Sequence, residues 1–548
     1  MNLINLKKNL PVFISFILTV VLIVAVYFQL NELQMSMFIN SDTLYLPALF
    51  RDLFVDKAKD IQWYLPAATC FFPDLMLFFS VHFFTSNFIT AMFFTGMLMN
   101  ILLILAFYLL LRESIKNISP LYLSIGINLL LLFHFATLYT GDYSLTFYLT
   151  IINYHIGAYI GSLFCLYFAM RYLNTNNLMN LGIMVLLYIL TFSSDFLTLF
   201  HLTIPLLSLC ILFFKRTHRT QAFSILIANI AGFGLGFFVY HLLLKSSSIK
   251  MLKISYLTFN FNKVAESYSL MFKHQFLFLK AMDIRSVIAL ICIISFITTS
   301  IILFTKLVKY FKSQEIEKSE FLEFTYLLFV VVQAIAIYNG PPLNGVYLDY
   351  SILRYNIYVF FLLVLNSGYL LYKLSLIKKL TKKVYVFSVL ITIMISLMGL
   401  RAMIITNFRE GSKQLFGYYP RYVKNLDEMC FRHNLKYGLS AYWEALYLNM
   451  MSKKDVRVYQ AYGDLNPYPH ITNLNWYFGT IDGKTPAPVF KFFIPDNLVD
   501  SLVYKRFEGH ILDTLKEGET TIVRTDPFTI NRYTLNLNFL TDKKNKKL

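Results

Sequence analysis

The chain has 548 residues, of which 57% are hydrophobic and only 15% are charged, and its formal net charge at pH 7 is +18. Soluble globular proteins carry about 25% charged residues, so this composition excludes an ordinary soluble protein and indicates a chain that needs lipid around it. The excess of Lys and Arg does not indicate nucleic-acid binding, because most of these residues lie in short loops between apolar runs, where they set membrane orientation and can contact anionic headgroups.

The first apolar run covers residues 11–30 and follows Lys7 and Lys8. It is long enough to span a bilayer and no small-residue cleavage site follows it, so the sequence predicts an uncleaved first helix with its N-terminus inside. The complete pattern predicts about eleven transmembrane helices, near residues 11–30, 88–111, 120–138, 146–170, 181–194, 196–214, 222–244, 286–305, 322–339, 353–372 and 384–401.

The basic residues support this topology. Loops on the predicted inner side carry Lys and Arg, whereas the outer loops at 139–145 and 340–352 carry neither. The long outer loops at 31–87 and 245–285 do contain basic residues, but long loops cross the membrane largely regardless of charge. We therefore expect a multi-pass membrane protein, and the richness of the chain in Lys, Asn, Ile and Phe fits a bacterial cytoplasmic (inner) membrane.

A carboxylate interrupts the apolar run 181–214. The run is too long for one span, and Asp195 lies at its centre after Ser193 and Ser194. One helix would place that carboxylate at the middle of the bilayer, which is energetically costly. Two short spans are expected instead, with Asp195 at an outer turn within reach of water.

The composition changes near residue 405, where charges, Pro and Asn become frequent. Helical and strand-like patterns alternate beyond this point, which predicts a soluble α/β domain over 405–540 on the non-cytoplasmic side, followed by a basic tail at 541–548. Tyr442 and Trp443 could form a sugar-stacking platform, but a core aromatic pair at the start of a helix is the favoured interpretation. The expected helices are 420–434 and 497–507, and the expected strands are 456–462, 487–494 and 520–524.

The first outer loop, residues 31–87, is too long for a simple connection and indicates a functional role. Asp42 lies just beyond the first span. Residues 48–54 are amphipathic, with Asp52 on their polar side, and Trp63 suits a segment that lies in the membrane interface.

These features resemble the GT-C superfamily of glycosyltransferases, which are polytopic enzymes that move a sugar from a polyprenyl-phosphate carrier onto an acceptor. The order of parts is similar along the whole chain, including a final extracytoplasmic α/β domain. The likeness at residue level lies in Asp42, Tyr45, Pro47, Trp63 and Pro73 of the first outer loop, and in Leu353-Arg354-Tyr355, which resembles the Arg-Tyr of aminoarabinose and mannose transferases.

Two positions depart from the family pattern. The paired acidic motif of the family is here Ser41-Asp42-Thr43, with one carboxylate, and its doubled proline is here Pro73-Asp74.

The resemblance implies a GT-C-like transmembrane domain over 1–404 and an inverting transfer at the outer face. Asp42 would act as the general base that removes the acceptor proton, and Arg354 would stabilise the departing phosphate. The implied partners are membrane lipid, a polyprenyl-phosphate sugar and a glycan, lipid or protein acceptor, without nucleic acid. No cofactor is expected, and no H-E-x-x-H motif or C-x-x-C pair indicates a metal.

Ordinary structural interpretations compete with these roles. Asp42 could be a helix cap or a solvated loop residue, Asp74 could cap a helix that begins at Leu75, and Arg354 could be an interfacial anchor. Asp195 is favoured as a helix cap, and His155 as a hydrogen-bonded core histidine. We take Asp42 as the candidate catalytic residue, and as candidate substrate-binding residues we take Asp74, His155, Asp195, Arg354 and Tyr355.

Two other functions remain open. A transporter or flippase of lipid-linked glycans would also be polytopic, but such proteins usually show internal repeats, and this sequence has none that we can identify. A non-enzymatic scaffold for envelope assembly would not depend on the acidic residues of the first outer loop.

Overall fold

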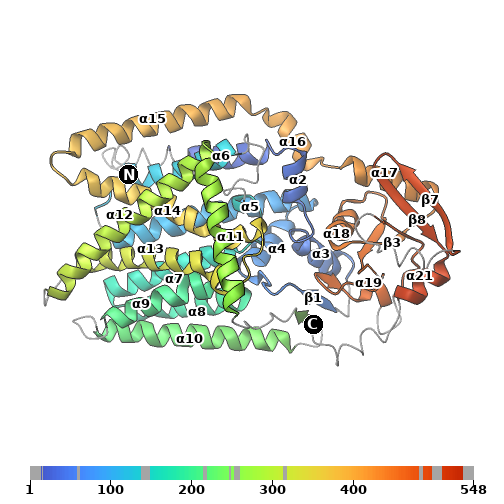
Figure 1. Ribbon diagram of the computed structural model, residues 1–548, viewed down its shortest axis with the longest axis horizontal. Helices are drawn as coiled ribbons and strands as arrows, with labels where there is room; N and C mark the ends of the chain where they lie inside the picture. Colours follow the sequence, from blue (N-terminus) through green and yellow to red (C-terminus); the bar gives the residue numbers. More distant parts are fainter. Residues whose placement is uncertain are drawn as a thin grey trace. The chain divides into compact units, whose positions relative to one another are not determined.

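The computed structural model is mostly helical (Figure 1) and divides into two compact units. Unit 1 comprises Met1–Asn31, Cys70–His241 and Ser255–Leu415, and unit 2 comprises Glu32–Thr69, Leu242–Ile254 and Phe416–Leu548. The structure describes residues 14, 17–57, 62–115, 117–137, 148–213, 219–245, 249–251, 260–312, 317–463, 465–479, 486–495 and 509–534. The predicted helix 497–507 and the predicted tail 541–548 lie outside these ranges.

Unit 1 is built from apolar helices. Seven described helices are long and apolar enough to cross a membrane, or eight if one bent pair near the N-terminus counts as a single span. The seven are α5 (Phe88–Ser114), α7 (Ile156–Thr175), α10 (Arg219–Leu244), α12 (Ile284–Lys312), α13 (Lys318–Leu343), α14 (Ile357–Ser375) and α15 (Thr381–Ile405). The remaining elements of this unit include α4 (Met76–His82), α6 (Pro120–Thr137), α8 (Leu178–Ser194), α9 (Ile204–Phe213), α11 (Phe261–Lys280), α16 (Phe408–Phe416) and the short turns η2 (Phe71–Leu75), η4 (Leu199–Thr203) and η5 (Tyr350–Tyr355).

These helices are compatible with a multi-pass membrane protein, whereas the count of eleven spans stays a prediction. The predicted start of the fourth span at residue 146 is wrong, because α7 begins only at Ile156. Asn153 and His155 have left-handed backbone angles, with φ of 70° and 68°, and this conformation cannot continue an α-helix.

Glycines allow two helices of unit 1 to pack closely. A Cβ atom on Gly126 of α6 would lie 2.4 Å from the carbonyl oxygen of Leu365, and one on Gly368 of α14 would lie 2.2 Å from that of Tyr122. Any side chain at either position would separate the backbones. Small residues at helix contacts are the usual means of close packing inside membranes.

Unit 2 contains a mixed five-stranded sheet with strand order β4-β3-β6-β8-β7. Strand β3 pairs in parallel with β4 and β6, whereas the pairs β6–β8 and β7–β8 are antiparallel. The strands are β3 (Tyr437–Ser440), β4 (Arg457–Gln460), β6 (Phe492–Phe493), β7 (Ile511–Glu517) and β8 (Thr520–Thr525), and the helices beside them are α17 (Arg421–Arg432), α18 (Tyr442–Met451), α19 (Asn475–Phe478) and α21 (Pro527–Thr534).

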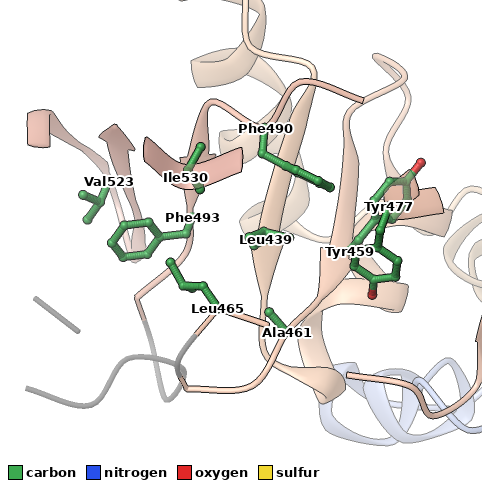
Figure 2. Close-up of a cluster of buried hydrophobic side chains, with 9 residues drawn as sticks. All are labelled: Leu439, Tyr459, Ala461, Leu465, Tyr477, Phe490, Phe493, Val523 and Ile530. Carbon is green, nitrogen blue, oxygen red and sulfur yellow. The ribbon is translucent and has the colours of Figure 1, made fainter. Parts of the chain in front are cut away.

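A buried apolar cluster forms the core of this sheet (Figure 2). Leu439 of β3 lies between Tyr459 of β4 and Phe493 of β6, and Ile530 of α21 joins the cluster from a helix. The cluster consists of Leu439, Tyr459, Ala461, Leu465, Tyr477, Phe490, Phe493, Val523 and Ile530. Burial of these side chains supplies the main driving force for folding of the region.

A second, three-stranded sheet brings the first outer loop into unit 2. Strand β1 (Trp63–Leu65) lies between β2 (Ile249–Met251), to which it is parallel, and β5 (Thr472–Asn473), to which it is antiparallel. The same unit contains α2 (Glu32–Phe38), α3 (Tyr45–Phe50) and the turn η1 (Arg51–Val55).

Trp63 was expected at the membrane interface, and this expectation is wrong because its side chain is 0% exposed. Asp52, expected on a polar face, is also buried. The Trp63 indole N–H donates to Asp52 Oδ2 at 3.0 Å, and the same carboxylate accepts from Asn473 at 2.8 Å and from Trp476 at 3.2 Å. Three N–H donors replace the water that the carboxylate loses on burial.

Candidate functional site

Polar side chains from four segments of unit 1 meet where helices begin and end. The centre of this cluster is a close pair, in which His155 Nδ1 lies 2.5 Å from Asp195 Oδ2. The two side chains are 12% and 6% exposed. His155 immediately precedes α7, and Asp195 immediately follows α8, so the packing of these two helices brings the pair together.

Asp195 has two partners. Its Oδ1 atom accepts a hydrogen bond from the backbone N–H of Leu197 at 2.9 Å, so it stabilises the turn that precedes η4. The favoured interpretation of Asp195 as a helix cap is wrong for η4, because the N-cap of η4 is Thr198 and no side chain caps it. The expectation that water reaches Asp195 is wrong, because it is buried and His155 takes the place of solvent.

Asp74 lies in η2 and is also buried. Its Oδ1 atom accepts from the backbone N–H of Asn153 at 3.2 Å, and no side chain caps α4, so the alternative interpretation of Asp74 as a helix cap is wrong. A Cβ atom on Gly157 would lie 1.9 Å from Asp74 Oδ2. The absence of a side chain at Gly157 therefore allows the carboxylate to lie against the first turn of α7.

Burial raises the pKa of Asp74, which lies in a short turn outside the candidate spans, to about 7. The hydrogen bond from Asn153 opposes this shift, and the negative charge of Asp195 adds to it. A carboxyl group that titrates near neutral pH beside a His–Asp pair is a typical feature of functional sites.

Arg354 and Tyr355 close the cluster from η5, the turn before α14. The Tyr355 ring centroid lies 4.9 Å from that of His155. The guanidinium carbon of Arg354 lies 5.1 Å from the centroid of the Tyr355 ring and 5.7 Å from that of Tyr154. These rings contact the cation by cation–π interaction. Arg354 therefore has protein partners, which an interfacial membrane anchor would not need.

The structure thus brings together all five predicted substrate-binding residues: Asp74, His155, Asp195, Arg354 and Tyr355. Two contributors were missed from sequence. Ser194 accepts from the backbone N–H of Phe72 at 2.8 Å and holds η2 in place, and Tyr358 donates to the carbonyl oxygen of Tyr154. Neither residue carries a signal in the sequence, because both act through backbone atoms of distant segments.

Asp42, the predicted catalytic residue, belongs to unit 2. It lies in a turn closed by Asn40 and Thr43. Asn40 Oδ1 accepts from the backbone N–H of Thr43 at 3.0 Å, and Thr43 Oγ1 accepts from the backbone N–H of Asn40 at 2.9 Å. Ser41 Oγ donates to the carbonyl oxygen of Tyr442 at 2.8 Å, and the Tyr442 hydroxyl donates to Asp42 Oδ1. The turn is therefore fixed on the first residues of α18.

Aromatic rings surround this carboxylate. The Tyr442 ring centroid lies 4.9 Å from those of Trp443 and His470 and 5.8 Å from that of Tyr468. Burial lowers the pKa of His470, and the negative charge of Asp42 opposes that shift. Trp443 is 59% exposed, so the favoured interpretation of a core aromatic pair is wrong for this residue.

The two clusters differ in chemistry. The cluster of unit 1 combines carboxylates, an imidazole and a guanidinium, whereas the cluster of unit 2 combines one carboxylate with an exposed indole and phenols. Among the described residues, no group of three or more His, Cys, Asp or Glu side chains could hold a metal ion. No protein-family model matches the chain, and no curated protein matches it.

Proposed function

We propose that the protein is a membrane glycosyltransferase that moves a sugar from a polyprenyl-phosphate donor to an envelope acceptor at the outer face. The observation that carries the proposal is the convergence of Asp74, His155, Asp195, Arg354 and Tyr355 in one cluster of a polytopic helical unit. A cation beside carboxylates and an aromatic ring suits a ligand with both a phosphate and hydroxyl groups.

In the proposed reaction Asp42 accepts the proton of the acceptor hydroxyl as its oxygen attacks the anomeric carbon. The bond from that carbon to the phosphate oxygen breaks, and its electron pair stays on the leaving phosphate. One base and no covalent intermediate are needed, so the configuration at the anomeric carbon inverts.

The contacts of Asp42 support its part in this reaction. Its side chain is half-buried and fixed by Tyr442, and the exposed ring of Trp443 lies beside Tyr442. Aromatic faces and hydrogen-bonding groups side by side are the combination that binds a polar molecule with apolar faces, such as a sugar.

The test is transfer from prenyl-phosphate sugars by the purified protein in lipid vesicles, with release of prenyl phosphate as the measurement. Asp42→Asn keeps an acceptor oxygen for Tyr442 and should lower the rate roughly 10²- to 10⁴-fold, the usual contribution of a general base. Asp56→Asn, at a carboxylate 46% exposed in the same unit, is the matched control and should retain the rate. Full activity of folded Asp42→Asn would refute the assigned base.

Transport of lipid-linked glycans is the second candidate, because buried His–Asp pairs in membrane proteins also serve as proton relays. The His155–Asp195 pair favours it. A transporter would move the labelled lipid between leaflets in Asp42→Asn as fast as in the parent protein, without releasing prenyl phosphate. A scaffold would do neither.

A further inference from the structure

Helix α11 (Phe261–Lys280) does not follow the direction of the candidate spans. In Figure 1 it runs across the direction of α10 and α13. It packs against α12 and α13. A helix that crosses the ends of membrane-spanning helices lies close to the plane of the membrane rather than along its normal.

Beside its contacts with α12, the buried side of α11 contacts residues 339–356. Tyr268 donates to Asn339 Oδ1 at 2.7 Å, and His274 Nδ1 lies 3.1 Å from the hydroxyl of Tyr347. Asn356 Nδ2 lies 3.6 Å from the sulfur of Met271. The helix therefore contacts the last turn of α13 and the connection from α13 to α14, which also carries Arg354.

The other side of α11 exposes large apolar side chains. Phe261, Phe272 and Phe276 are 72%, 57% and 63% exposed. Their spacings of eleven and four residues correspond to three turns and one turn of helix, so the three rings form one stripe. Exposed phenylalanines in such a row need an apolar environment, which water does not supply.

A separate row on the same helix is charged. Glu266, Lys273 and Lys280 are exposed and follow one another at intervals of seven residues, which places them on one side of the helix. They lie about a quarter of a turn from the phenylalanine stripe at 100° per residue. The whole helix carries three lysines and one glutamate, so its net charge is positive.

We propose that α11 lies in the headgroup region of one membrane leaflet. Its phenylalanine stripe enters the boundary of the acyl chains, and Lys273 and Lys280 of the charged row lie at the level of the lipid phosphates. An exposed apolar stripe beside basic residues, on a helix in the membrane plane, is typical of this position. The inference does not depend on the proposed enzymatic activity, but it sets the membrane depth of the loop that carries Arg354.

Site-directed spin labelling tests the proposal in the full-length protein, reconstituted in vesicles of phosphatidylcholine and phosphatidylglycerol. All five native cysteines are buried, so a thiol introduced on the surface of α11 can be labelled selectively, with the parent protein as the blank. Labels at Phe272→Cys and Phe276→Cys are compared with labels at Lys273→Cys and Lys280→Cys. Power saturation in oxygen, which concentrates in lipid, and in a water-soluble nickel chelate gives the depth of each label.

The expected result is preferential contact with oxygen at positions 272 and 276 and with the nickel chelate at positions 273 and 280. Greater exposure of positions 272 and 276 to the chelate would place the stripe in water and overturn the proposal. Shielding of these two positions from both reagents would also overturn it, because a protein partner or a second copy of the chain would then cover the stripe.

Discussion

His155 and Asp195 lie 40 residues apart in the sequence, yet Nδ1 of the first is 2.5 Å from Oδ2 of the second inside a helical unit. Both lie at the ends of regular helices, where the backbone is free to turn a polar side chain inward. The cluster that we assign to substrate binding is organised around this contact.

Asp195→Ala should destabilise the protein by about 3–5 kcal/mol, because removal of one partner leaves the other buried group unpaired. Thermal or denaturant unfolding in detergent measures the change. Asp283→Ala is the matched control. The Asp283 and Arg285 side chains of that ion pair are 30% and 27% exposed, so the substitution should cost no more than about 1 kcal/mol. Equal losses in the two variants would contradict a structural role for the buried pair.

Gly157→Ala should cost about 1–3 kcal/mol and displace Asp74, because the new methyl group would meet that carboxylate at 1.9 Å and Pro73 Cδ at 2.7 Å. Gly182→Ala in α8 is the control, since no atom lies within 4 Å of its added Cβ. That substitution should stabilise the protein by up to about 1 kcal/mol, since alanine favours helix. Unfolding in detergent should give a lower midpoint for Gly157→Ala than for Gly182→Ala, and the reverse order would contradict the packing of Asp74 against Gly157.

Asp52 gives unit 2 a pH-dependent stability. Burial raises the pKa of Asp52 from 3.8 to about 6, although hydrogen bonds from Asn473 and Trp476 and the charge of Arg51 oppose the shift. The folded state then holds a proton that the unfolded state has released, so the contribution is present below the unfolded pKa and is lost as the pH rises through 6.

Between about pH 4 and pH 7 this loss should amount to about 3 kcal/mol. Asp52→Asn carries no titrating group and should show a flatter dependence of unfolding free energy on pH over this interval. Parallel curves for the parent and the variant would show that Asp52 ionises as an ordinary exposed carboxyl group.

Glu323 joins three helices of unit 1. It lies on α13, and its carboxylate is 2.8 Å from Lys306 Nζ of α12 and 2.8 Å from Lys373 Nζ of α14. Glu323→Gln leaves two cations without their counter-ion and should cost about 1–3 kcal/mol. Glu320→Gln disrupts a more exposed pair with Lys309 and should cost less than about 1 kcal/mol, so an equal effect on unfolding would contradict the assignment.

The apolar runs predicted most of the helices of unit 1, because hydrophobicity over some twenty residues is a local property. In unit 2, residues 420–434 and 520–524 correspond to α17 and β8, and the strand predicted at 456–462 contains β4. The edge strand β7 was not predicted. Its apolar residues are Ile511, Leu512 and Leu515, and Leu512 lies on an exposed position, so no regular alternation of apolar residues marks this strand.

The errors share a physical cause. Trp63 suits a membrane interface by its chemistry, and only Asp52, Asn473 and Trp476, brought to it by folding, explain its burial. The site shows the same limit. His155 and Asp195 were each chosen from sequence, but their pairing depends on how the ends of α7 and α8 meet. Local patterns identify such residues, and the partners come from tertiary structure.

The hydrogen bond between Asp52 and Asn473 spans 421 residues of sequence, and all seven candidate spans lie between the two. At ordinary rates of protein synthesis, about 5–20 residues per second, the carboxylate is made roughly 20–80 seconds before the amide. Strand β1 is therefore without β5 while the helices of unit 1 are inserted one after another. A chaperone that shields residues 32–69 during this interval would protect the nascent chain from aggregation, and truncation before residue 473 should leave that segment open to proteolysis.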